Sequence, residues 1–391
     1  MFPVSRPVCM SRGLSRRLAL ACLGALALAA CQPATSTLPQ AAATGPVQVA
    51  LLVPAGSGQA GDELLARSIE NAARMAITDL GDVQIDLRVY PTGGQPTAAG
   101  GAAAQAVADG AKVILGPVFA EEANAAGTAA AASGVNVLSF SNNTAIAGGN
   151  VFVLGPTFDN SARRLAQYAV GAGKTQVMIV HDLNAQGALG RAAIERGMAA
   201  AGGSIVATGS YEFSQNGIVQ AIPALAEQAK TSGAQALFLT ADTAGALPLL
   251  SQLLSENGVD PAVVQYIGLT RWDIPAATLA LPGVQGGWFA MPDPALYAQY
   301  VARYEATFGE QPHPVSALAY DGMAAIGALA KSGAGLDRIS LTQGAGFVGV
   351  NGVFRLLADG TNERGLAVAQ IQDGAVVTID PAPRSFAGAG F

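Results

Sequence analysis

Cysteine, histidine and charged residues are all scarce in this chain. Of its 391 residues, three are cysteines, two are histidines and 12% are charged. Cys9 and Cys22 fall within an apolar N-terminal segment, so Cys31 is the one cysteine that follows it. The chain beyond Cys31 therefore forms neither an internal disulfide nor a cysteine-based zinc site. We expect its stability to come from a packed core, since 51% of the residues are hydrophobic.

Positive charge is also in short supply. The formal net charge is −6, and removing the four arginines of the N-terminal segment (Arg6, Arg12, Arg16 and Arg17) leaves about −10. Nucleic acids and polybasic membrane contacts both require clustered basic residues. The composition therefore argues against a nucleic-acid partner and against electrostatic membrane binding. Beyond the N-terminal segment, no apolar run is long enough to span a bilayer.

The N-terminal segment ends in the tetrapeptide LAAC, residues 28–31. Its arginines precede an apolar run at 18–30, which is too short for a membrane span and typical of a signal peptide. Two small alanines precede Cys31, as in the bacterial lipobox, where the thiol carries a diacylglyceryl group. We expect a lipoprotein signal peptide at 1–30 and a flexible, uncharged tether at 31–46. The alternative is an ordinary secretory peptide with an Ala-x-Ala cleavage site.

From residue 47 onward, β-rich runs alternate with alanine-rich helical stretches. This rhythm predicts an α/β fold with two Rossmann-like lobes and a central cleft. Strands are expected at 47–53, 83–90, 113–115 and 135–140, and in a second set at 176–181, 204–211, 236–240, 265–269 and 286–290. Helices are expected at 62–80, 97–109, 120–133, 188–201, 218–232, 246–256, 294–308 and 314–331, and segment 151–159 is expected to carry the chain between the lobes.

The predicted domain spans 47–381. Its first lobe is expected at about 47–155 plus 294–345, its second at about 156–293 plus 346–381, with a tail at 382–391. Strand-like runs near the end, at 353–357, 367–371 and 375–379, are separated by Asp359-Gly360 and Asp373-Gly374, which is typical of β-hairpin turns.

A glycine-rich loop, GSGQAG at 56–61, matches the dinucleotide-binding pattern between a strand and a helix. That fold also requires an acidic residue at the end of the second strand, and this strand ends in Tyr90-Pro91-Thr92. We therefore expect no nicotinamide cofactor. The loop is interpreted instead as a rim of the cleft, where Ser57 and Gln59 offer hydrogen bonds.

Catalytic and metal-binding patterns are missing as well. His181 and His313 have no metal-ligand spacing, and no nucleophile elbow accompanies them. We expect a non-enzymatic protein without a cofactor or metal. Cleft ligands of parallel sheets lie at the carboxyl ends of the strands, and the polar residues predicted near this cleft are Ser57, Gln59, Ser139, Ser141, Asn143, Gln186, Asp242, Arg271 and Asp321.

Several phrases carry a family resemblance. VALLVP at 49–54, ILGPVF at 114–119 and SFSN at 139–142 resemble type I periplasmic binding proteins of the leucine-receptor kind. Other phrases are similar to the penicillin-binding protein activators of that superfamily: GGWFAMPDP at 286–294, SALAYD at 316–321, GVNGVFR at 349–355 and ERGLAV at 363–368.

The resemblance implies a non-enzymatic lipoprotein that activates a bifunctional penicillin-binding protein, a peptidoglycan synthase. Gln32 after the lipidated cysteine implies anchoring at the inner leaflet of the outer membrane, facing the periplasm. The alternative is a solute-binding lipoprotein of an ABC transporter, for an amino-acid-like or other small polar ligand. In the amino-acid receptors an aromatic residue is expected at Gln186 and an acid near Arg271, so a leucine-like ligand is not favoured.

Overall fold

The computed structural model of the chain describes residues 45–386. The predicted signal peptide at 1–30, Cys31 and the tether up to residue 44 lie outside the described residues, as does the end of the predicted tail, 387–391. None of the helices in the described range is long and apolar enough to cross a membrane.

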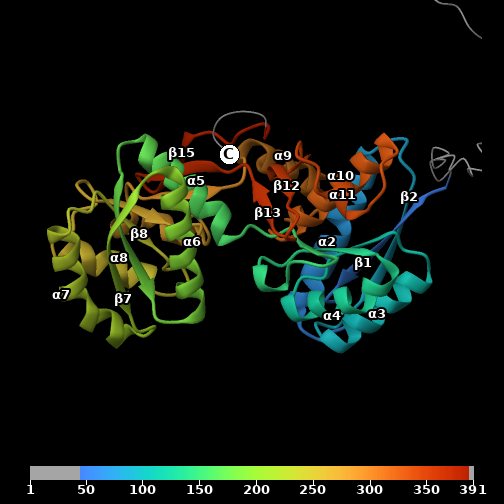
Figure 1. Ribbon diagram of the computed structural model, residues 1–391, viewed down its shortest axis with the longest axis horizontal. Helices are drawn as coiled ribbons and strands as arrows, with labels where there is room; N and C mark the ends of the chain where they lie inside the picture. Colours follow the sequence, from blue (N-terminus) through green and yellow to red (C-terminus); the bar gives the residue numbers. More distant parts are fainter. Residues whose placement is uncertain (1–44, 387–391) are drawn as a thin grey trace, which may run out of the picture. The chain divides into compact units, whose positions relative to one another are not determined.

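The first lobe is built on a five-stranded parallel sheet of strand order β2-β1-β3-β4-β5 (Figure 1). Its strands are β1 (Val47–Val53), β2 (Ile85–Pro91), β3 (Val113–Leu115), β4 (Asn136–Ser139) and β5 (Val151–Val153). The helices between them are α2 (Ala60–Asp79), α3 (Pro96–Ala108) and α4 (Ala120–Ala130), with short 3-10 turns η1 (Ala131–Ser133) and η2 (Thr144–Ile146).

Alternating side chains of β1 cover both faces of this sheet. Val49 and Leu51 pack with α2 on one face, whereas Ala50 and Leu52 pack with α3 and α4 on the other. Burial on both faces explains why the strand reads as a continuous apolar run. Strand β2 departs from that expectation, because it lies at the sheet edge and is only partly buried.

The first lobe also recruits the chain that returns from the second lobe. Helices α9 (Pro294–Phe308), α10 (Ser316–Ser332) and α11 (Arg338–Leu341) are followed by a small antiparallel sheet of β11 (Phe347–Gly349), β12 (Gly352–Leu356) and β13 (Asn362–Arg364). Phe347 and Phe354 belong to the same core as α2 and α10. The predicted lobe boundary at residue 346 is therefore corrected, since apolar packing keeps β11 and β12 with the first lobe.

The second lobe holds a seven-stranded sheet of order β15-β14-β10-β9-β8-β6-β7. Its strands are β6 (Gln176–Asp182), β7 (Ser204–Tyr211), β8 (Ala236–Leu239), β9 (Gln265–Gly268), β10 (Trp288–Met291), β14 (Ala367–Gln372) and β15 (Ala375–Asp380). Its helices are α5 (Phe158–Gly171), α6 (Ala185–Ala201), α7 (Gln215–Thr231) and α8 (Leu247–Glu256), with 3-10 turns η3 (Ala276–Ala280) and η4 (Pro282–Val284). The first five strands pair in parallel, and β14 and β15 are antiparallel.

Two cores sandwich this sheet. Met178 and Val180 pack with α7 and α8, while Val177 and Ile179 pack with α5 and α6. Figure 1 shows these four helices around the sheet in green and yellow. The predicted α/β fold with two Rossmann-like lobes is confirmed.

Both predicted hairpin turns join antiparallel strands. Asp373 adopts a positive φ of 51° beside Gly374, between the paired strands β14 and β15. Asp359-Gly360 lies between β12 and the antiparallel β13, a short strand that the sequence did not reveal. Segment 151–159 also differs from its prediction, because its first residues form the edge strand β5 before the chain crosses at 154–157.

Candidate functional site

A cavity of about 320 Å³ lies where residues of both lobes meet. We call it the interlobe cavity. Its first-lobe lining is Asn142, Tyr297, Pro314, Val315, Leu318 and Asn351. Its second-lobe lining is Phe158, Ser161, Leu269, Thr270, Arg271, Ile274, Ala290 and Met291, and the crossing segments add Pro156, Thr157, Pro292, Arg364 and Leu366.

The walls of the interlobe cavity are mostly apolar. Leu269 directly follows β9, and Met291 ends β10, so two neighbouring parallel strands deliver them to the same edge of the sheet. Phe158 begins α5, whose start is fixed by a capping box in which Thr157 accepts from the Asn160 N–H at 3.3 Å. Apolar walls with a few placed polar groups are typical of small-molecule sites.

Arg271 is the charged group of the second-lobe wall. It follows β9 and forms a two-pronged ion pair with Asp273: Nε donates to Oδ1 at 2.9 Å, and Nη2 donates to Oδ2 at 2.5 Å. The Arg271 side chain is 29% exposed, against 12% for Asp273. The arginine, but not the aspartate, lines the cavity.

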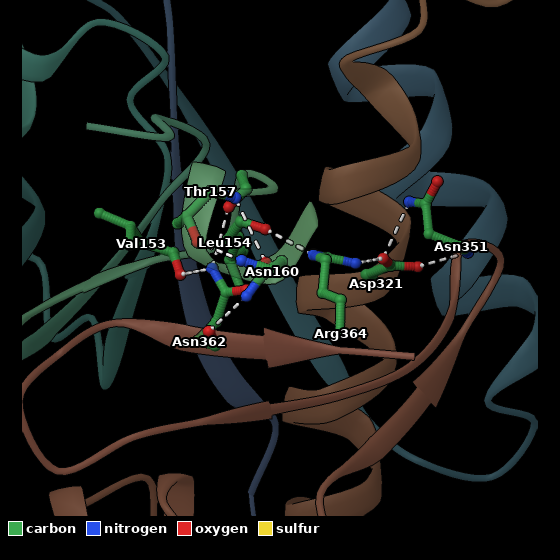
Figure 2. A network of polar contacts seen from close by, with 9 residues as sticks. Val153, Leu154, Thr157, Asn160, Asp321, Asn351, Asn362 and Arg364 are labelled. Atoms are coloured by element: carbon green, nitrogen blue, oxygen red, sulfur yellow. Dashed lines mark hydrogen bonds and ion pairs between the residues drawn. The ribbon is translucent and has the colours of Figure 1, made fainter. Parts of the chain in front are cut away.

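Arg364 is the charged group on the crossing side, and Figure 2 shows it between two sets of acceptors. Its Nη1 donates to Asp321 Oδ2 at 3.0 Å, and Nε and Nη2 donate to the Leu154 carbonyl at 3.0 and 2.5 Å. Both side chains of the ion pair are almost fully buried, 3% exposed for Arg364 and 0% for Asp321. The pair joins α10 to β13 and to the first crossing segment.

Asn351 completes the environment of Asp321. Its Nδ2 donates to Asp321 Oδ2 at 2.9 Å and its backbone N–H to Oδ1 at 3.3 Å, as Figure 2 shows. Gly349 permits this arrangement, because a Cβ at that position would overlap the Asp321 carboxylate. Asp321 thus accepts three hydrogen bonds from two residues, and the charge of each member of the pair is compensated.

Amide hydrogen bonds tie β13 to the first crossing. Asn362 Nδ2 donates to the carbonyls of Val153 and Gly155, both at 2.9 Å. Asn160 Nδ2 returns a bond to the Asn362 carbonyl at 2.9 Å. Figure 2 shows that these residues continue the network away from Arg364. The backbone beside the interlobe cavity is therefore held by buried side chains.

Glu363 extends this linkage between the lobes. It forms ion pairs with Arg163 of α5 and with Arg355 of β12. The Glu363 side chain is largely buried between the two arginines. One carboxylate therefore connects a helix of the second lobe with the small sheet of the first.

Tyr297 brings a phenol to the cavity from α9. Burial raises its pKa, the nearby Arg271 guanidinium acts in the opposite direction, and Asp273 adds to the rise. The hydroxyl therefore stays protonated at neutral pH and can donate a hydrogen bond. This first-lobe phenol and the second-lobe Arg271 line the same cavity.

Of the nine polar residues that the sequence predicted for the cleft, Arg271 lines the interlobe cavity. Asp321 lies behind the wall, bound to Arg364 and Asn351. Ser139 is fully buried, and its hydroxyl donates to the Pro117 carbonyl at 2.9 Å while accepting from the Ser141 N–H at 3.1 Å. Ser139 and Asp321 therefore stabilise the fold beside the cleft through these hydrogen bonds.

Two other predicted residues meet across the lobes. Asn143 and Gln186 line a smaller hollow of about 80 Å³, which Phe158 and Arg196 also border. The Asn143 side chain accepts from the Ala145 N–H at 3.0 Å. Both residues therefore border one hollow beside the interlobe cavity, and their role in ligand binding stays a prediction.

The remaining predicted residues lie apart from the interlobe cavity. Ser141 accepts from the Asn143 N–H at 3.1 Å. The Ser57 hydroxyl accepts from the Gln59 N–H at 3.1 Å, which is a hydrogen bond within the glycine-rich loop. Asp242 is exposed at the end of β8. Their role in binding stays a prediction.

Sequence reasoning missed Tyr297, Asn351, Arg364 and the apolar wall. Asn351 and Arg364 belong to the phrases that resemble the family, and this resemblance could have identified them. The local sequence does not indicate which side of a strand faces a cavity. The apolar residues read as ordinary core. Among residues 45–386, no cluster of histidine, cysteine and acidic residues has the makings of a metal site.

Comparison with known proteins places the chain in a family. A family model described as periplasmic binding protein matches residues 46–375. No curated protein matches the sequence.

Solved structures of solute-binding proteins are similar in fold. A putative branched-chain amino acid ABC transporter protein from Rhodospirillum rubrum has a TM-score of 0.72 at 18% identity, covering 86% of this chain and 100% of that one. A branched-chain amino acid ABC transporter periplasmic ligand-binding protein from Burkholderia xenovorans has a TM-score of 0.65 at 19% identity, covering 88% and 97%. A solute-binding protein from Rhodopseudomonas palustris, in complex with 3,4-dihydroxybenzoic acid, has a TM-score of 0.58 at 20% identity, covering 86% and 96%.

Two α/β lobes and a cavity between them are thus accompanied by a family match over most of the chain. Proteins of this family bind ligands without transforming them, as the sequence led us to expect. The chain belongs to the periplasmic binding protein family.

Proposed function

We propose that this protein is a solute-binding protein of an ABC transporter, which holds a small organic ligand in the interlobe cavity. The observation that carries the proposal is the cavity itself, because both lobes and the crossing segments supply its walls. Its volume of about 320 Å³ falls in the range of small-molecule sites. The similar structures from Rhodospirillum, Burkholderia and Rhodopseudomonas, which are named for transport or solute binding, support the same function.

We further propose that lipid on Cys31 anchors the protein, and that Gln32 directs it to the inner leaflet of the outer membrane. The LAAC tetrapeptide and the residue after it support this proposal. Mass spectrometry of the mature chain should find a diacylglyceryl group on Cys31. A chain that begins elsewhere, or that carries no lipid, would contradict the anchor.

Thermal unfolding of the purified protein tests the proposed function. Leucine, isoleucine, valine, benzoate and 3,4-dihydroxybenzoate are each titrated, because binding to the folded state raises the melting temperature with ligand concentration. Ser161→Phe should fill the cavity and abolish the rise. Ser255→Phe, on the exposed face of α8, is the matched control and should keep it. Absence of any rise in the wild-type protein, or a rise that survives Ser161→Phe, would overturn the proposal.

A second candidate is activation of a bifunctional penicillin-binding protein. The favouring observation is that the activator-like phrases contribute Asp321, Asn351 and Arg364, the buried network beside the crossings. A backbone held by buried hydrogen bonds and an ion pair suits a protein that docks on a synthase as a rigid body. Adding the protein to purified bifunctional synthases and measuring glycan polymerisation and crosslinking tests this candidate. Stimulation that is unaffected by Ser161→Phe would favour it over solute binding.

A further inference from the structure

The charged groups that face the interlobe cavity all have one sign. Arg271 and Arg364 line it, whereas no aspartate, glutamate or lysine does so in the described part of the chain. Their carboxylate partners, Asp273 and Asp321, stand behind the walls. A ligand in the cavity therefore meets guanidinium N–H groups and no acid.

The two arginines differ in the donors they can still offer. A guanidinium has five N–H donors. Arg364 uses all three of its nitrogens on Asp321 and Leu154. Arg271 uses Nε and Nη2 on Asp273, and within residues 45–386 its Nη1 makes no hydrogen bond. Arg271 is therefore the available anion receptor, with Nη1 free for a carboxylate oxygen.

An amino-acid ligand would leave its ammonium group without a counter-charge in this cavity. The polar groups that line it besides the arginines are neutral, among them Asn142, Ser161 and Thr270. A buried charge without an opposite charge is strongly disfavoured. A carboxylate that lacks the ammonium avoids this cost.

The remainder of the ligand has to be apolar, because Leu269, Met291, Leu318 and Phe158 form the surrounding walls. Tyr297 lines the same cavity as Arg271, and its protonated hydroxyl is a further neutral hydrogen-bond donor in the walls. Removing apolar ligand surface from water provides the favourable free energy, and the charged end provides selectivity.

We propose that the interlobe cavity binds an apolar organic acid as its carboxylate, without an ammonium group, with the carboxylate at Arg271 Nη1 and the hydrocarbon body against the apolar walls. This inference rests on the proposed solute-binding function and specifies its ligand class.

Isothermal titration with matched pairs tests the ligand class. In each pair the two molecules differ by the ammonium group: 4-methylpentanoate against L-leucine, and 3-phenylpropanoate against L-phenylalanine. We expect the deamino acid to bind at least about tenfold more tightly in one or both pairs, which corresponds to about 1.4 kcal/mol. Equal or tighter binding of the amino acids would overturn the ligand class and leave solute binding intact. Failure of all four to bind, together with no thermal response to the broader panel above, would overturn both.

Variants of the Arg271–Asp273 pair test whether Arg271 binds the ligand. The ligand in these titrations is the deamino acid that binds the wild-type protein more tightly. Arg271→Gln should weaken its binding about tenfold to a hundredfold, as expected for a lost charged hydrogen bond. Asp273→Asn should strengthen it several-fold, because it frees Nε and Nη2, and this variant keeps the test valid if Arg271→Gln folds poorly. Arg191→Gln, in the exposed pair with Glu195 on α6, is the control and should change nothing. Equal affinity of Arg271→Gln and Arg191→Gln would overturn the assignment.

Discussion

Two arginine–aspartate pairs border the interlobe cavity, and they differ in burial and in partners. The Arg364–Asp321 pair is 3% and 0% exposed, and its members also bind Leu154 and Asn351. The Arg271–Asp273 pair is 29% and 12% exposed, and the aspartate is two residues away in the sequence.

The difference separates structural from binding roles. Arg364 is bound on every nitrogen, so its charge holds the crossings and has little left for a ligand. Arg271 lines the largely apolar cavity, and within residues 45–386 its Nη1 makes no hydrogen bond. We conclude that an arginine in a cavity wall indicates a ligand site only if its protein partners leave some of its N–H donors unused.

The largest expected effect is on the buried pair. Asp321→Asn leaves Arg364 buried without a counter-charge and should lower the free energy of unfolding by about 3–5 kcal/mol. Chemical denaturation measures it. Glu195→Gln, in an exposed pair, is the control and should cost less than about 1 kcal/mol. If both variants lose the same small amount, the buried pair does not hold the crossings.

A steric change at Gly349, which lies against Asp321, should also disrupt the Arg364–Asp321 pair. Gly349→Ala places a Cβ against the Asp321 carboxylate, so the side chain must move from its partners. We expect a loss of about 1–3 kcal/mol in denaturation. Gly344→Ala is the matched control, since nothing lies within 4 Å of its Cβ. Similar stabilities of the two alanine variants would contradict the close packing around Asp321.

Glu122 is a buried carboxyl that lacks the arginine and asparagine partners of Asp321. It is fully buried in α4, and burial raises its pKa, although Thr92 and the Phe119 backbone act in the opposite direction. Its contribution to stability is therefore greatest below the ordinary pKa of 4.5 and declines as the pH rises toward the folded value.

Glu122→Gln should remove this decline. Relative to the wild type, the variant should gain on the order of 1 kcal/mol between pH 4 and pH 7, measured as the difference in unfolding free energy. A difference between the two proteins that does not change with pH would show that Glu122 is ionised and partnered in the folded protein.

The smallest stability effect is expected at the cavity pair. Asp273→Asn removes a partly exposed partner, so the free energy of unfolding should change by less than about 1 kcal/mol. The melting temperature without ligand measures it. A loss as large as that of Asp321→Asn would show that both pairs are structural, and the distinction between them would fall.

The fold was largely predictable because its signals are local. Buried parallel strands produce apolar runs, as in β1 and β6, and proline marks the start of α9. The lobe assignment of β11 and β12 was not predictable, because it depends on Phe347 and Phe354 contacting a core formed by distant segments. The three-residue strand β13 is likewise too short to carry a pattern.

The site was predicted only in part. Arg271 was found because it follows a strand at the edge where ligands bind. Asp321 and Ser139 were expected in the cleft, yet their hydrogen bonds go to Arg364 and to Pro117. A polar residue near a cleft can serve the ligand or the backbone, and only its partners in space distinguish the two.

The central claim is that Arg271 binds the ligand and that the Arg271–Asp273 pair is dispensable for folding. Replacing both members, in the double variant Arg271→Gln/Asp273→Asn, removes the charges without leaving either one unpaired. Titration of 4-methylpentanoate into this variant and into the wild-type protein tests the claim directly. We predict a melting temperature close to that of the wild type and an affinity at least about tenfold lower. Wild-type affinity in the double variant would contradict the account.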